Sequence, residues 1–231
     1  NYARKPPPSM VQWSADSASH VSSMTDGDFY GTETSTTLIE DCSAQIRFTN
    51  SNGAIEILKE SLPLLAGEII DTATMNMAKL KAFLAEQVAD AKAKGVLFSL
   101  HMKATMMKIS DPIMFGHCVK EYFADAFEKH SETFDKLGVN ANNGIGDAFD
   151  KISSLPAIEK ATIEIDLLKC IENGPRLAMV DSNRGITNLH VPSDVIIDAS
   201  MPVVVRFEKK KRKKMSLFLL FSITNNYITN N

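Results

Sequence analysis

The sequence has few of the residues that would build a disulfide scaffold or a zinc site. Its three cysteines, Cys42, Cys118 and Cys170, are far apart and odd in number, and none stands in a Cys-x-x-Cys or Cys/His spacing. We therefore expect reduced, mostly buried thiols. Such thiols are typical of a reducing compartment, so we predict a cytoplasmic protein, or a mitochondrial one if the source is eukaryotic.

The sequence also lacks a long apolar run and a large excess of either charge. No stretch reaches the roughly 18–20 apolar residues that a membrane-spanning helix needs. A formal charge of −3 over 231 residues gives no basic footprint for nucleic acid. Residue 1 is Asn, and no secretory signal follows it. We predict a soluble protein with no nucleic-acid partner and no membrane association. The missing Met indicates a lost beginning or a cut from a longer chain.

The residues from His20 to Lys59 predict β structure. Val, Thr, Phe, Tyr and Ile dominate this stretch, and turn residues interrupt it at 25–28 and 50–53. Asn52-Gly53 lies between SAQIRFT and AIEILK, which predicts a hairpin because both residues tolerate positive φ. Gly31, inside FYGTETSTTLI, indicates a weakened strand or a bulge.

Helices and strands are expected to alternate after about residue 75. An apolar stripe predicts a helix from Asn76 to Lys94, which Gly95 ends. A buried strand should follow at Val96–Leu100. A second helix should begin with Asp111 as its cap and Pro112 in its first position, and run to His130.

Two further helices, at 147–154 and 156–172, and two strands, at 177–180 and 186–189, complete the pattern. This alternation behind a β-rich start makes α/β the best fold class.

The last segment differs in kind from the rest. Residues 207–231 combine a Lys/Arg run, the apolar patch MSLFLLFSI and an Asn/Thr/Ile-rich end. This composition is expected of translated non-coding sequence and lacks a periodic face that could pack, so we predict a disordered or artefactual tail after a domain at 1–206. The alternatives are a polybasic membrane or partner anchor and a nuclear-type signal.

One candidate catalytic group follows the buried strand. Ligands of open α/β folds lie at the carboxyl ends of strands, and Lys103 stands there in SLHMKATMMKISD. A lysine among methionines can have a lowered pKa and act as a proton donor or acceptor; an ordinary surface lysine is the alternative. His101 and His117 are either structural groups or functional ones, and His101 could orient Lys103.

A pair of carboxylates is the second candidate. Asp194 and Asp198 lie four residues apart, so in a helix both would share one face. Carboxylates are ligands for Mg²⁺ or Mn²⁺; the alternative is two solvated first-turn acids after Ser193. The GxG of residues 143–147 has no preceding strand and no third glycine, so we interpret it as a turn and a helix cap.

The longest distinctive strings resemble a known family. HMKATMMKISDPIMFGHCVKEYFADAF and MVDSNRGITNLHVPSDVIIDASMP are similar to the monomeric NADP-dependent isocitrate dehydrogenases, as are NYARK and SHVSSMTDGDFYG. The resemblance extends from Asn1 to Pro202 and is lost after about Val203. It implies an incomplete fold of the isocitrate/isopropylmalate dehydrogenase type and a parent enzyme that works as a monomer in the tricarboxylic acid cycle.

The resemblance also implies roles for two residues. Lys103 matches the catalytic lysine that handles a proton at isocitrate, and Asp198 matches one of three aspartates that bind Mg²⁺ or Mn²⁺. In the family, hydride passes from C2 of isocitrate to NADP⁺, and the metal polarises the C2 oxygen and stabilises the enolate formed as CO₂ leaves. The lysine exchanges the proton at that centre.

The remaining family residues are expected outside this chain. The substrate-binding Ser/Asn/Arg cluster would precede NYARK. The catalytic tyrosine, two further aspartates and the NADP⁺-binding residues would follow the end of the resemblance. One carboxylate cannot hold Mg²⁺ tightly, because that ion needs several oxygen ligands. We predict that this polypeptide alone is inactive.

Overall fold

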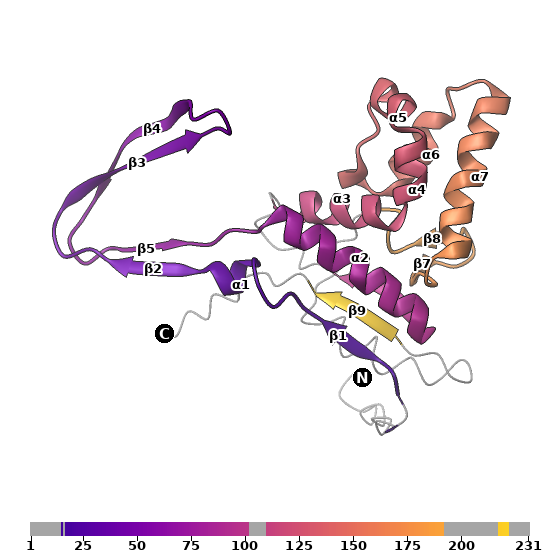
Figure 1. The fold of residues 1–231 in the computed structure, drawn as a ribbon, viewed down its shortest axis with the longest axis horizontal. Helices are drawn as coiled ribbons and strands as arrows, with labels where there is room; N and C mark the ends of the chain where they lie inside the picture. Colours follow the sequence, from indigo (N-terminus) through magenta and orange to yellow (C-terminus); the bar gives the residue numbers. More distant parts are fainter. Residues whose placement is uncertain (1–14, 16, 102–109, 192–216, 222–231) are drawn as a thin grey trace, which may run out of the picture. The chain divides into compact units, whose positions relative to one another are not determined.

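The computed structural model describes residues 15, 17–101, 110–191 and 217–221. They form two compact units, Thr25–Asn76 and the remainder of the chain (Figure 1). Helices and strands are mixed, as the α/β prediction expects. Among the described residues, no helix has the length and apolar character to cross a membrane. Cys118 and Cys170 are buried and Cys42 is exposed, and all three are free thiols.

The unit Thr25–Asn76 consists of a short helix and two antiparallel strand pairs. Its elements are α1 (Phe29–Thr32), β2 (Thr34–Thr37), β3 (Cys42–Thr49), β4 (Ile55–Leu64) and β5 (Ile69–Thr72). Strand β2 pairs with β5, and β3 pairs with β4. The β3–β4 hairpin turns through Gly53, whose φ of 79° suits glycine, so the predicted Asn52-Gly53 hairpin is confirmed.

The strand expected around Gly31 is wrong at its start, because residues 29–32 form helix α1 instead. Asp28 precedes this helix, and its Oδ1 accepts a hydrogen bond from the Gly31 N–H at 3.0 Å. Such a cap satisfies a backbone donor that has no partner within a helix. The strand β2 begins only after the helix ends.

This unit buries little apolar surface of its own within the described residues. Its exposed large apolar residues are Tyr30 on α1 and, along the strands and their connections, Ile39, Ile46, Phe48, Ile55, Ile57, Leu58, Leu62, Leu65 and Ile69. A two-stranded ribbon is at best marginally stable in water unless more strands or a helix cover it.

The second unit holds most of the helices and the buried core. Its helices are α2 (Met77–Lys94), α3 (Ser110–Tyr122), α4 (Ala124–Lys129), α5 (Ser131–Leu137), the 3₁₀ turn η2 (Ala141–Asn143), α6 (Ile145–Ile152) and α7 (Ala157–Asn173). Its strands are β1 (His20–Ser22), β6 (Leu97–His101), β7 (Met179–Asp181), β8 (Ile186–Thr187) and β9 (Leu217–Phe221).

Helix α2 confirms the first predicted helix. It buries Leu80, Leu84 and Ala91 along one face. It ends at Gly95, whose N–H donates to Lys92 O while the Val96 N–H donates to Ala91 O. This pair of bonds is the Schellman arrangement that a glycine with positive φ permits.

The second predicted helix is partly wrong. Helix α3 starts at Ser110, so Asp111 lies in its first turn rather than at its cap. The helix also breaks at Phe123, which has φ −104° and ψ 29° and separates α3 from α4. Phe123 is fully buried, and packing of this side chain takes precedence over helix continuity that local propensity alone would favour.

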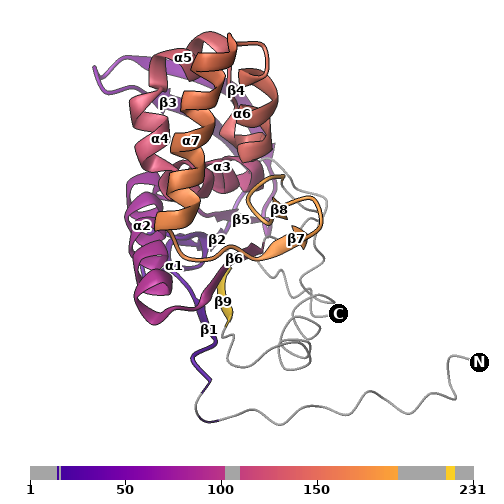
Figure 2. The same cartoon turned by 90° about the vertical axis from the view of Figure 1, so that its right-hand side faces the viewer.

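A three-stranded parallel sheet has the order β1-β9-β6 (Figure 2). Its central strand comes from the tail that we expected to lack any packing face. Leu217–Phe221 nonetheless forms a strand that pairs in parallel with both β1 and β6, and the rest of that tail lies outside the described residues.

Candidate functional site

The two predicted site residues lie outside the described residues. Lys103 falls within 102–109, and Asp198, like Asp194, falls within 192–216. The structure does describe the residues that precede each of these two segments, up to His101 and up to Val191. Lys103 follows the end of β6 by two residues, and Asp198 lies seven residues beyond Val191.

A single buried side-chain amide links the chain that precedes Lys103 to the chain that precedes Asp198. The Leu100 N–H donates to Asn188 Oδ1 at 2.8 Å, and Asn188 Nδ2 donates to the Leu100 carbonyl oxygen at 2.5 Å. Both residues are buried at 5% exposure. The side chain of Asn188 therefore satisfies both backbone groups of Leu100, as a neighbouring strand would. Position 100 and position 188 are held together although 88 residues separate them.

Backbone bonds extend this contact along β6. The Phe98 N–H donates to Arg176 O, the Ala178 N–H donates to Phe98 O, and the Asn188 N–H donates to Ala178 O. The chain entering β7 thus runs beside β6, with a parallel bridge between Phe98 and Leu177. The carboxyl end of a parallel strand is where α/β folds place their ligands, and Lys103 lies just beyond this end of β6.

His190 lies next to Val191, the last described residue before the Asp198 segment. Its ring stacks on Phe149, with ring centroids 5.8 Å apart and an interplanar angle of 4°. The Thr187 N–H donates to His190 Nδ1 at 3.1 Å, and the Thr187 hydroxyl lies 2.9 Å from the same nitrogen. Burial lowers the pKa of His190. The acceptor role of Nδ1 assigns the proton of the neutral ring to Nε2.

Two glycines bring helix α6 against the backbone at His190. The Ile145 N–H donates to Leu189 O at 2.9 Å, and the Gly146 N–H donates to His190 O at 3.0 Å. A Cβ on Gly144 would lie 2.1 Å from His190 O, and one on Gly146 would lie 2.9 Å from it. The GxG of this loop therefore permits a close backbone approach. Sequence reasoning recognised a turn and a cap but missed this docking, because the partner is more than 40 residues away.

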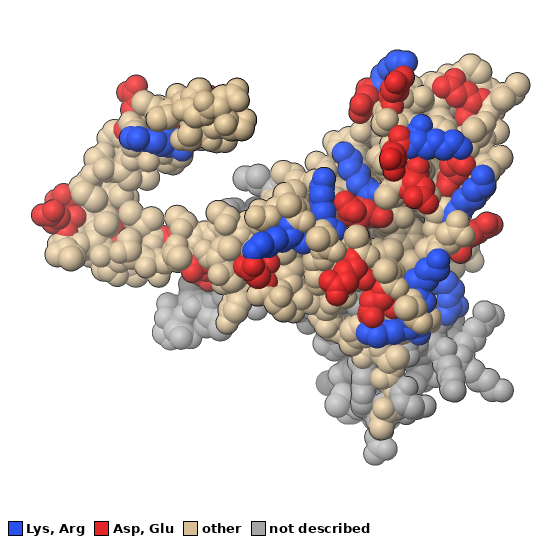
Figure 3. Space-filling model, viewed as in Figure 1, with Lys and Arg blue, Asp and Glu red and all other residues tan. Residues whose placement is uncertain are grey.

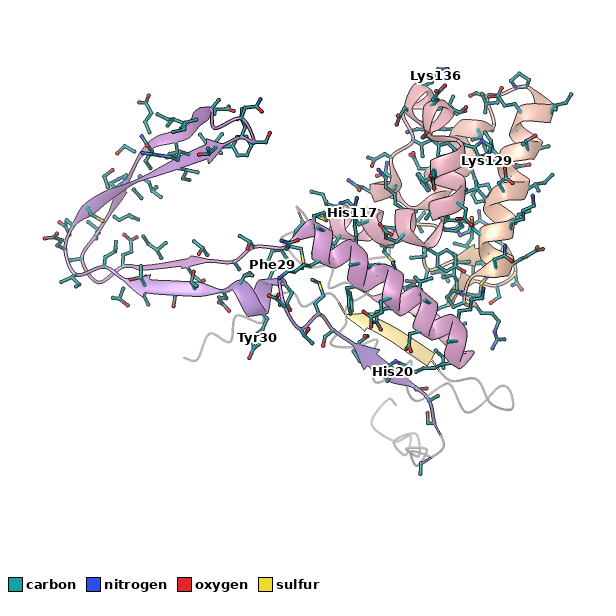
Figure 4. The ribbon with its side chains drawn as sticks, viewed as in Figure 1. His20, Phe29, Tyr30, His117, Lys129 and Lys136 are labelled. Atoms are coloured by element: carbon teal, nitrogen blue, oxygen red, sulfur yellow. The ribbon has the colours of Figure 1, made fainter. Side chains whose placement is uncertain are left out.

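The half-buried His117 and the buried Asp111 of α3 each have, within the described part of the chain, one buried atom without a hydrogen bond. His117 (Figure 4) has an Nδ1, and Asp111 has an Oδ1, that are buried and without a hydrogen-bond partner among the described residues. Burial lowers the pKa of His117, and the charges of Lys81 and Lys120 lower it further. Burial raises the pKa of Asp111, and a hydrogen bond with Ser110 opposes this. Nothing in their contacts gives either residue a chemical role.

The described residues do not assemble a metal centre. They contain no group of three His, Cys, Asp or Glu side chains that could hold an ion. On the face drawn in Figure 3, acidic and basic side chains are interspersed over the helices. Neither feature provides the oxygen cluster that Mg²⁺ requires.

Comparison with known proteins gives the family context. The family model for monomeric isocitrate dehydrogenase matches residues 1–216. The NADP isocitrate dehydrogenase 2 of Colwellia maris is 54% identical over 205 residues, which are 89% of this chain and 28% of that protein. The NADP isocitrate dehydrogenase of Azotobacter vinelandii is 50% identical over 206 residues, and the NADP isocitrate dehydrogenase 2 of Mycobacterium tuberculosis is 51% identical over 205 residues, with the same coverages. The chain spans about 28% of the length of these relatives.

Proposed function

The chain belongs to the monomeric isocitrate dehydrogenase family, and from this membership we propose that it supplies part of the active site of an NADP-dependent isocitrate dehydrogenase. The reaction converts isocitrate and NADP⁺ to 2-oxoglutarate, CO₂ and NADPH. Relatives about 50% identical over 89% of the chain support the proposal. From the same likeness we propose that the chain is part of a fold of the isocitrate/isopropylmalate dehydrogenase type.

In this proposal Lys103 exchanges a proton with the substrate. Oxidation at C2 removes a hydride to NADP⁺ and the hydroxyl proton to a base, and the resulting β-keto acid loses CO₂. The carbon that held the carboxylate then needs a proton. A lysine near this carbon can deliver it, and such proton transfer contributes typically about 10²–10⁴-fold to a rate.

One structural observation carries the idea of a shared site. The hydrogen bonds between Leu100 and Asn188 hold together the chain just before the Lys103 segment and the chain that leads to Asp198. Because Asn188 is buried and bonds both backbone groups of Leu100, this contact fixes the relative position of the two stems. For this reason we propose that Lys103 and Asp198 act on the same bound isocitrate.

The described residues do not fit a divalent ion by themselves. Asp198 would provide one carboxylate. The other ligands, and the residues that bind NADP⁺, would belong to the part of the relatives that this chain does not span. The proposal therefore includes inactivity of the isolated chain.

Two assays test the proposed function. The purified chain with isocitrate, NADP⁺ and Mn²⁺ should form no NADPH. A chimera of the Colwellia maris protein, in which the 205 matched residues of this chain replace their counterparts, should form NADPH. In that chimera Lys103→Met should lower kcat by about 10²–10⁴-fold, whereas Lys120→Met, at an exposed position of α3, should leave it unchanged. Equal activity of the Lys103→Met chimera and the parent chimera would refute the role of Lys103.

A further inference from the structure

The central strand of the parallel sheet lies outside the family match. The family model matches residues up to 216, and β9 begins at Leu217. Both strands beside it, β1 and β6, lie inside the match. The sheet therefore joins two family strands through a segment that the family comparison does not contain, as Figure 2 shows for β1, β9 and β6.

The backbone of β6 requires a strand at this place. Phe98 directs its N–H and C=O to the chain at Arg176 and Ala178, and Leu100 directs both groups to Asn188. Because successive residues of a strand turn their peptide groups to opposite edges, Ser99 faces the other edge, where its register partner is Leu219 of β9. Ser99 has no exposed surface, so water could not replace a missing strand there without opening the core.

Strand β1 depends on the same neighbour. Its register partners His20↔Phe218, Val21↔Leu219 and Ser22↔Leu220 are all on β9. Independent side-chain contacts hold β1 to helix α2, where Ser22 Oγ donates to Gln87 Oε1 at 2.7 Å and His20 Nε2 lies 3.5 Å from Asp90 Oδ2. Adjacent strands are about 4.8 Å apart, so two strands held on either side of β9 leave a gap one strand wide.

We propose that β1 and β6 form an acceptor slot for one parallel strand, specified by backbone hydrogen bonding. In this chain the occupant is Leu217–Phe221. In the longer members of the family the occupant is a strand from the part of their sequence that this chain does not span. The inference goes beyond the proposed function and does not depend on it.

The slot favours a particular kind of strand. Phe98, Ser99 and Leu100 of β6 are at most 5% exposed, so the occupant continues a buried sheet. Parallel strands buried in this way are typically rich in aliphatic residues. The slot should therefore accept different apolar sequences with good β propensity, and should reject proline, which lacks the N–H that the ladder needs.

Amide hydrogen exchange of the full chain tests the slot. Leu220→Pro removes a backbone donor from β9, and Leu220→Val is its matched control because it keeps the N–H. In the proline variant, protection at Ser99 and Ser22 should fall by about a hundredfold or more as the strand opens locally. Protection at Phe98, which faces Arg176, should remain close to that of the unchanged chain, as should every site in the valine variant.

A block replacement tests whether the slot is tolerant of sequence, even if the proline variant fails to fold. Val-Ile-Val-Ile-Val in place of residues 217–221 should preserve protection at Ser99 and Ser22 within about tenfold, because the backbone ladder is unchanged. Unchanged protection of Ser99 in Leu220→Pro would overturn the pairing. Loss of protection in the block replacement would overturn the acceptor slot in favour of a contact specific to this tail.

Discussion

Replacing Asn188 tests the contact that joins the two stems of the candidate site. The substitution Asn188→Leu keeps a side chain of similar size but removes the amide that bonds Leu100 N–H and C=O. Both backbone groups would be left buried without partners. Each orphaned group costs about 1–3 kcal/mol, so we expect the free energy of unfolding to fall by about 2–4 kcal/mol, since partial relaxation recovers some of the loss.

Urea unfolding followed by circular dichroism measures this loss, and amide exchange at Leu100 locates it. The control is Asn183→Ala, at an exposed turn residue whose hydrogen bond to Asp181 uses its backbone N–H. The control should change stability by less than about 0.5 kcal/mol. If Asn188→Leu costs no more than the control, the buried amide does not hold the two stems together and the reasoning is refuted.

Two further predictions concern the contacts around His190. Because burial lowers the pKa of His190 in the folded state, the stability that this residue contributes is complete above the unfolded pKa near 6.5 and is lost as pH falls below it. The substitution His190→Phe keeps a ring for the stack on Phe149 and should therefore reduce the pH dependence of the free energy of unfolding between about pH 7 and 5. An unchanged pH dependence would count against this role of His190. Gly144→Ala would place a Cβ 2.1 Å from His190 O, whereas Gly185→Ala meets nothing within 4 Å although its φ is also positive. The first substitution should thus cost at least about 2 kcal/mol more than the second, since only backbone strain of about 1–2 kcal/mol is common to both, and equal costs in thermal unfolding would contradict the close approach.

Local sequence patterns predicted those elements whose causes are local. The Asn52-Gly53 hairpin, the end of α2 at Gly95 and the start of α7 after Pro156 each follow from the φ that a residue tolerates or the donor that it lacks. The helix α1 was missed because its cap at Asp28 was outweighed by the β propensity of the residues that follow.

The framework of the site depends instead on long-range contacts. From the local sequence, Asn188 is only a polar residue at the end of a strand. Its two hydrogen bonds to Leu100 depend on the tertiary structure, so the sequence does not predict them. The same holds for Gly144, whose glycine is required by a carbonyl at position 190. The roles of Lys103 and Asp198 came from family resemblance, since spacing alone left Asp194 and Asp198 equivalent.

The most direct test of the central claim separates these two aspartates. In the chimera with the Colwellia maris protein, Asp198→Asn and Asp194→Asn each remove one charge from the same segment, and Mn²⁺ affinity and isocitrate-dependent NADPH formation are measured for both. We predict that Asp198→Asn weakens Mn²⁺ binding by about tenfold or more and lowers turnover, because a carboxylate ligand is lost, while Asp194→Asn resembles the parent chimera. Equal effects of the two substitutions, or a larger effect of Asp194→Asn, would contradict the assignment of Asp198 to the metal and with it the proposed site.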